Sequence, residues 1–213
     1  FQDVSRLKTA DQKGDFSIFC LRNICIHIFA LLLAIPPLVS AGIVINEIMF
    51  HPTSGGVENP LEEFIELYNA DPVVPVDLTG WQIDRGIDFT FPAVTLDPGS
   101  YLVIAADITT FFNRHPASAA TVVGGWSGKL SNAGERIRLV DTLGVEADSV
   151  KYADEGEWAE RVRVVLGGEN GWDWQSDADG TGVSLELIQP GLPNNRGQNW
   201  SSSTLQGGTP GLV

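Results

Sequence analysis

The chain of 213 residues is long enough for one sizeable domain with extensions, or for at most two small domains. Its net charge of −14 repels phosphate backbones, and no basic patch offsets it, so the composition argues against direct nucleic-acid binding. The only cysteines, Cys20 and Cys25, precede the expected start of the mature protein. We therefore expect a mature chain with no disulfide, no thiol nucleophile and no thiolate metal site.

Residues 1–41 are predicted to be a leader that ends in a secretory signal peptide. Arg22 precedes a short apolar run at 24–39, and small residues stand three and one positions before the Ala41–Gly42 bond. This pattern is typical of a cleavable export signal. Two consecutive prolines and the shortness of the run argue against a spanning helix, which needs roughly 20 apolar residues. The sequence predicts cleavage after Ala41, export to the medium or cell surface, and no membrane span in the mature chain.

Residues 42–152 are predicted to form the main part of an all-β domain. Two β-rich runs, 43–50 and 63–69, are separated by a Gly- and Pro-rich gap at 51–56 that neither strand can cross. Short β-prone runs broken by turn residues continue to the end of this segment. Such regular spacing indicates a β-sandwich or a barrel.

The second β-rich run has the two-residue period of a half-buried strand. Ile65 and Leu67 fall on one face, and Phe64, Glu66 and Tyr68 fall on the other. Only one of the two faces is therefore expected to meet a core.

One short helix and one hairpin are expected further along this domain. Asp107 is suited to cap a helix that ends at Arg114, because His115-Pro116 cannot continue it. The run 134–141 alternates between apolar and polar residues and leads through a Gly-containing turn into 145–152. These two runs predict an antiparallel pair.

The last two segments carry weaker signals. Residues 153–182 are rich in acidic residues, Trp and Gly, and the alternation disappears there apart from Val162 to Leu166. We predict a long surface excursion. Residues 183–213 are predicted to form a last strand at 183–188 and an extended tail.

Ordered motifs across the chain resemble those of the bacterial lamin-tail domain family. Three motifs are similar to the opening of that domain: Ile45-Asn46-Glu47-Ile48, Glu63-Phe64-Ile65-Glu66-Leu67-Tyr68-Asn69 and Asp77-Leu78-Thr79-Gly80-Trp81. Its central hairpin and its end resemble Leu130-Ser131-Asn132-Ala133-Gly134-Glu135-Arg136-Ile137, Leu139-Val140-Asp141 with Gly144, Asp179-Gly180-Thr181-Gly182-Val183-Ser184-Leu185-Glu186, Trp200 and Thr209-Pro210-Gly211. The resemblance implies an immunoglobulin-like β-sandwich.

The resemblance also implies a binding or tethering role without catalytic residues. Exported bacterial relatives are often one module of a larger secreted or surface protein, and the acidity of this chain argues against a nuclear or DNA role. We expect a non-catalytic, exported module that binds a protein or a surface glycan. Two alternatives stay open: the recognition module of an enzyme whose catalytic domain lies beyond Val213, and a metal-dependent hydrolase that uses the acidic loop at 173–186.

Three carboxylates, Glu47, Glu63 and Glu66, cluster in the family motifs. Paired carboxylates can act as acid and base, but no His, Ser or Lys partner pattern accompanies these three. We expect them to be outward strand residues, or Glu47 and Glu66 to accept hydrogen bonds from neighbouring loops.

A candidate calcium loop lies near the carboxyl end. Gln175, Asp177, Asp179, Gly180 and Glu186 occupy positions 1, 3, 5, 6 and 12 of an EF-hand-like loop, with oxygen ligands at alternating positions. The neutral Gln at the first position and the absence of flanking helices weaken the match. No other cofactor is indicated, and the alternative to calcium is a plain Asp-Gly turn.

Trp172 and Trp174 are the best candidates for a ligand platform. Exposed tryptophans stack on sugars or anchor protein partners, because they bury a large area at low entropy cost. The simpler alternative is that these indoles cover the open end of the sandwich, because a long loop needs apolar anchors.

Overall fold

The structure is a computed structural model that describes residues 42–212, so the predicted signal peptide lies outside the described residues. These residues belong to one unit, Ser40–Val213. Strand β1 (Ile43–Met49) follows directly after Gly42, whose carbonyl accepts a hydrogen bond from Ala70 N at 2.6 Å. Among the helices that the structure describes, none has the length and apolar character needed to cross a membrane.

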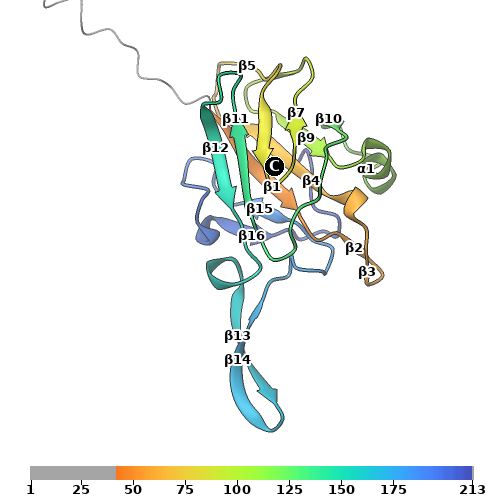
Figure 1. Cartoon of the computed structure of the whole chain (residues 1–213), viewed down its shortest axis with the longest axis vertical. Helices are drawn as coiled ribbons and strands as arrows, with labels where there is room; N and C mark the ends of the chain where they lie inside the picture. The colour runs from red at the N-terminus through yellow and green to blue at the C-terminus, as the bar shows by residue number, and fades with distance from the viewer. Residues whose placement is uncertain (1–41, 213) are drawn as a thin grey trace, which may run out of the picture. The chain divides into compact units, whose positions relative to one another are not determined.

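The larger sheet has six strands with β1 near its middle (Figure 1). Its order is β10 (Thr121–Gly124), β9 (Tyr101–Ala105), β4 (Phe64–Asn69), β1, β15 (Leu185–Leu187) and β16 (Trp200–Ser202). Neighbours are antiparallel except β9 and β10, which are parallel and connected through helix α1 (Ile108–Arg114). The two neighbours of β1 therefore come from opposite ends of the domain.

The second sheet has four strands in the order β12 (Glu146–Lys151), β11 (Arg136–Val140), β6 (Gln82–Arg85) and β7 (Phe89–Thr90). β11 and β12 are the hairpin expected from the alternation at 134–152. Short pairs and single turns complete the fold: β2 (Thr53–Ser54) with β3 (Val57–Glu58), β5 (Val76–Asp77) with β8 (Thr95–Leu96), and the 3₁₀ turns η1 (Pro60–Glu62), η2 (Gly156–Trp158) and η3 (Gly197–Asn199).

One hydrophobic core joins the two sheets. The six-stranded sheet contributes Ile45, Ile65, Leu67, Leu102 and Ile104, and the four-stranded sheet contributes Ile83, Ile137, Leu139 and Val150; all are essentially inaccessible to solvent. Burial of alternate residues from two facing sheets is the arrangement of a β-sandwich. The predicted all-β sandwich is confirmed.

Strand β4 is buried on both faces, so its interpretation as a half-buried strand is wrong. Phe64 and Glu66 are fully buried on the face opposite Ile65 and Leu67. Helix α1 covers part of that face, where Phe111 packs edge-on against Phe64 with 5.7 Å between ring centroids. The two-residue period of β4 alone would leave Phe64 and Glu66 in solvent, but other parts of the chain cover this face.

The predicted helix is confirmed. The carboxylate of Asp107 accepts a hydrogen bond from Thr110 N at 2.7 Å, and His115 N donates to Phe111 O at the other end. The N-cap supplies an acceptor to a backbone N–H that has no partner within the helix.

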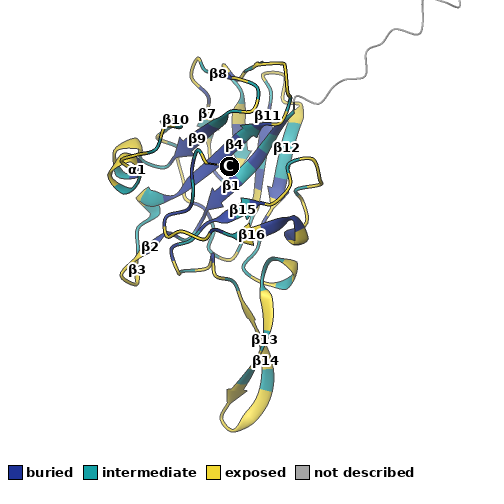
Figure 2. Cartoon of the chain, turned by 180° about the vertical axis from the view of Figure 1, so that it is seen from behind, coloured by how far each residue is buried: buried dark blue, intermediate teal, exposed yellow. Residues whose placement is uncertain are grey.

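The segment 153–182, predicted to be a surface excursion, contains a regular hairpin. β13 (Glu160–Leu166) pairs with β14 (Glu169–Gln175) in a separate two-stranded sheet. This hairpin extends away from the two main sheets, and most of it is exposed (Figures 1 and 2). A strand exposed on both faces has no buried face to impose alternation on its sequence.

The strand predicted at 183–188 is present as β15, but it is not the last one. β16 pairs with it antiparallel, with Leu187 opposite Trp200. The following residues do not trail into solvent: Ser203 is buried, and Ser203 N donates to Ser184 O at 2.9 Å.

Candidate functional site

The β13–β14 hairpin carries Trp172, the most exposed aromatic residue of the described chain, and the exposed Trp174. Leu166 pairs with Glu169 across a two-residue loop of Gly167 and Gly168, whose φ angles are +60° and +88°. A type I′ turn requires positive φ at both central residues, which glycine adopts without steric cost. The turn fixes the register and therefore decides which side chains share a face.

One face of the hairpin gathers two indoles and two guanidinium groups. Trp172 lies opposite Arg163, and Trp174 lies opposite Arg161. The Arg161 guanidinium also lies over the Trp172 ring, 4.8 Å from its centroid, in a cation–π contact. We call these four residues the Trp/Arg face.

The two indoles do not cover the end of the sandwich, so that alternative is wrong for them. Trp172 is 58% exposed and Trp174 is 42% exposed, on a strand and not in an irregular loop. The tip of the hairpin is also apolar, with Val165 68% and Leu166 83% exposed. Apolar side chains that gather on an exposed element are typical of an interaction surface.

The four candidate calcium ligands occupy different environments. Gln175 ends β14, and Glu186 lies in β15, where it accepts a hydrogen bond from Thr209 Oγ1 at 2.5 Å. Asp179 contacts His51 instead, with 2.6 Å between its Oδ1 and the ring Nδ1. Asp177 is exposed between them.

The acidic members of this set do not converge. Within residues 42–212, no three His, Cys, Asp or Glu side chains are grouped so that they could hold a metal ion. Gly180 has φ +78°, as the Asp-Gly turn requires. Calcium binding by Gln175, Asp177, Asp179 and Glu186 stays a prediction.

Glu47 and Glu66 are buried side by side, so their interpretation as outward strand residues is wrong. The two face each other across β1 and β4, next to Ser184 and the carboxyl-terminal segment. Glu47 Oε1 accepts from Ser184 Oγ at 2.6 Å and from Thr209 N at 2.9 Å. Glu66 accepts from Asn46 Nδ2 at 3.0 Å and from Gly211 N at 2.5 Å.

These bonds show that the carboxylates hold the end of the chain in place, as the loop-binding alternative predicts. Burial raises the pKa of Glu66 to about 7, against hydrogen bonds from Gly211 and Asn46 that lower it. Burial, together with the charge of Glu66, raises the pKa of Glu47 well above its ordinary value. The sequence does not identify the donors, because they lie far along the chain from both carboxylates.

Glu63 is buried at a different place. Its Oε2 accepts a hydrogen bond from Leu130 N at 2.8 Å, and burial raises its pKa to about 7. Oε1 of the same carboxylate is buried and has no hydrogen-bond partner in the structure. This residue fixes the loop that leads into β11.

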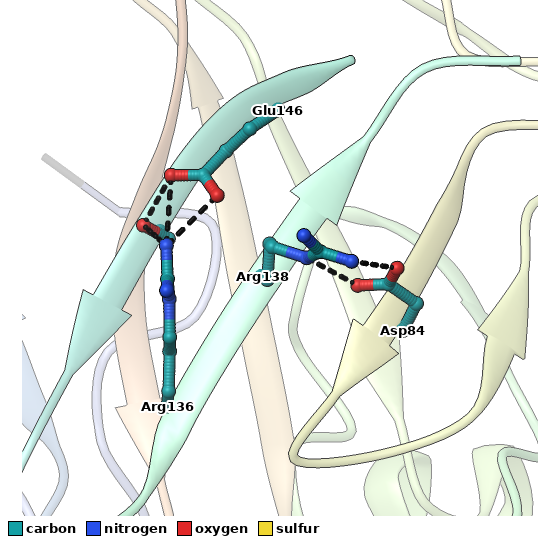
Figure 3. Close-up of polar contacts among 5 residues, drawn as sticks. Asp84, Arg136, Arg138 and Glu146 are labelled. Carbon is teal, nitrogen blue, oxygen red and sulfur yellow. Dashed lines mark hydrogen bonds and ion pairs between the residues drawn. The ribbon is translucent and has the colours of Figure 1, made fainter. Parts of the chain in front are cut away.

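The arginines of β11 are engaged with acidic partners and do not form a basic groove (Figure 3). Arg138 makes a two-pronged contact with Asp84, in which Nε donates to Oδ1 at 2.8 Å. Arg136 forms an ion pair with Glu146 at 2.8 Å. These contacts lower the pKa of Asp84 and raise that of Arg138, so both stay charged at neutral pH.

Comparison with known proteins identifies the sandwich. The family model described as Lamin Tail Domain matches residues 37–154, which is more than half of the chain. No curated protein matches the chain. The matched residues include both strands that carry the buried carboxylates and end before the β13–β14 hairpin. The chain belongs to the lamin tail domain family and has the immunoglobulin-like β-sandwich of that family.

Proposed function

We propose that this protein is a non-catalytic, exported tethering module that binds a protein partner through the β13–β14 hairpin. It acts as one part of a larger secreted or cell-surface protein. Membership of a family of immunoglobulin-like interaction domains supports the general role. The observation that carries the specific proposal is the exposed hairpin, with its Trp/Arg face and apolar tip.

The hairpin suits a protein partner better than a small ligand. Each of its two strands has only one hydrogen-bonded neighbour, so both outer edges present unpaired N–H and C=O groups. A partner can add a strand to such an edge and place side chains against Trp172 and Trp174. An isolated hairpin is marginally stable in water, and pairing would order it further.

Charge supports an acidic partner surface. The chain as a whole carries −14, whereas the Trp/Arg face presents Arg161 and Arg163 beside the indoles. Arginine and tryptophan are the residues most enriched at the energetic centres of protein interfaces. Steering by these charges would weaken as ionic strength rises.

Nothing in the described residues favours the hydrolase alternative. Asp177, Asp179 and Glu186 do not converge, and Glu47 and Glu66 are engaged with the carboxyl-terminal segment. The recognition module of a longer enzyme would use the same hairpin, so it shares the test below.

The test is site-specific crosslinking with a photoreactive amino acid in place of Trp174. The matched control carries the same amino acid in place of Asp173, the exposed neighbour on the opposite face. Irradiation with cell-surface and secreted proteins of the source organism should yield a defined adduct from position 174 only. Equal adducts from both positions, or none from position 174, would contradict the proposal.

Binding to the identified partner should then depend on the indoles. Trp172→Ala with Trp174→Ala should weaken affinity at least about tenfold, the usual effect of removing anchor tryptophans. Asp173→Asn should bind as the unmodified protein does. A glycan adduct in place of a protein would overturn the choice of partner.

A further inference from the structure

A cavity of about 510 Å³ lies at the base of the hairpin. It is bounded by the turn η2, the start of η3, strand β16 and the residues that enter and leave the hairpin, including Glu160 and Gln175. These two residues pair across β13 and β14 and lie on the face opposite the Trp/Arg face. The cavity is therefore separate from the proposed protein-binding surface, and its volume is within the range of ligand sites.

The apolar part of the wall consists of Trp158, Trp200, Leu185 and Ala159. Trp158 and Trp200 lie with ring centroids 5.8 Å apart and planes inclined by 42°. Trp200 Nε1 donates to Asn194 O at 2.7 Å, which fixes the orientation of this indole. Trp158 is only partly buried. Trp200 is only 7% exposed, so Trp158 offers most of the aromatic surface for the C–H face of a ring.

The rest of the lining is polar and acidic. Glu157, Glu160 and Asp177 contribute carboxylates, while glutamines 175 and 198 and serines 176, 201 and 202 contribute amides and hydroxyls. No Lys or Arg is among the lining residues, although Arg196 is 3.8 Å from Glu157. The buried Oγ of Ser176 has no hydrogen-bond partner in the structure. Such a lining offers many acceptors and several donors.

We propose that this cavity binds a saccharide residue that is neutral or carries an amine. Pyranose rings have apolar C–H faces that stack on indoles, and hydroxyl groups that donate to carboxylates and bond to amides and serines. The three carboxylates repel uronic and other acidic sugars and favour an ammonium group. Two of the predicted calcium ligands, Gln175 and Asp177, take part here in binding the sugar. This inference goes beyond the proposed function and does not depend on it.

The test is isothermal titration of the unmodified protein with three soluble tetrasaccharides, of glucosamine, N-acetylglucosamine and galacturonate. The first two should bind, and the acidic one should not. No binding by either of the first two, or equal binding of galacturonate, would overturn the proposal. This comparison needs no variant, so it does not depend on folding of an altered chain.

Variants then locate the site. Gln175→Ala with Gln198→Ala removes two exposed lining amides, and we expect at least a tenfold loss of saccharide affinity with an unchanged melting temperature. Trp172→Ala with Trp174→Ala is the matched control and should bind the saccharide normally. An unchanged affinity in the glutamine variant would place any sugar site elsewhere. Failure of the crosslinking test leaves these results unaffected, so the two proposals can fail separately.

Discussion

At the scale of single residues, the buried carboxylates give this protein an unusual dependence on pH. The pKa of Glu66 is about 7 in the folded chain and near its ordinary value of 4.5 when unfolded. The folded state therefore holds this proton more tightly, and the stabilisation is fully present below pH 4.5 and lost as the pH rises through 7. A difference of this size corresponds to a contribution on the order of 3 kcal/mol.

We predict that the free energy of unfolding falls between pH 5 and pH 8, and that Glu66→Gln reduces this fall. The amide cannot ionise, and Asn46 can turn its own amide to accept a bond from it. Urea unfolding at several pH values measures the effect, with Glu169→Gln at the exposed hairpin as the control. A variant that keeps the full slope would show that Glu66 does not titrate as described. Some slope should persist in the variant, because Glu47 and Glu63 also have raised pKa values.

At the scale of elements, the hairpin and the carboxyl-terminal segment contribute to stability in opposite ways. No residue of β13 or β14 belongs to the hydrophobic core described above. The segment at 203–211, which has no strand of its own, supplies hydrogen bonds to two buried carboxylates. Regular structure is therefore a poor guide here to what holds the sandwich together.

We predict that replacing residues 161–174 by Gly-Gly changes the melting temperature by no more than a few degrees. The exposed side chains of the hairpin bury little surface, and Glu160 and Gln175 are already paired neighbours that a short turn can join. Thermal unfolding followed by circular dichroism measures this. Removal of residues 209–213 is the comparison and should cost at least about 2 kcal/mol, because it leaves buried acceptors without donors. A large loss in the hairpin deletion would mean that the hairpin packs on the sandwich.

The sequence predicted correctly those helices and strands whose limits are set by residues within or next to them. Asp107 begins helix α1 and His115-Pro116 ends it. Strand β11 follows from its alternation of polar and apolar residues, in which Ile137 and Leu139 point into the core. The same reasoning misplaced Glu66, because α1 and the carboxyl-terminal segment cover its face from positions distant in sequence. It also missed the hairpin, where Trp172 and Trp174 alternate with polar residues but both faces are exposed. Both tryptophans are exposed in the structure, and the geometry that exposes them depends on the Gly167-Gly168 turn.

At the scale of the whole molecule, strand β1 begins at Ile43, close to the predicted cleavage site after Ala41. Gly42 accepts a hydrogen bond from Ala70, and a Cβ at Gly42 would lie 2.9 Å from Asp71 N. Export with cleavage after Ala41 stays a prediction.

We predict that the protein produced in a bacterial host with its leader is recovered outside the cytoplasm with Gly42 as its first residue. Mass spectrometry of the intact protein and amino-terminal sequencing test this. Ala41→Leu is the control, because a bulky residue directly before the bond blocks cleavage. Retention of an uncleaved chain in the cytoplasm would contradict export.

The position of β1 also determines when the sandwich can be completed during synthesis. One neighbour of β1, strand β4, follows closely in sequence, but the other neighbour, β15, is made much later. The hydrogen bond from Ser184 to Glu47 joins residues that are 137 positions apart. Until the ribosome has made that region, one edge of β1 stays open and the carboxylates of Glu47 and Glu66 stay hydrated. Contacts between such distant segments slow folding, so the nascent chain remains in an unfinished state for most of its translation. That delay is compatible with the export proposed above, in which the chain passes a channel before it folds.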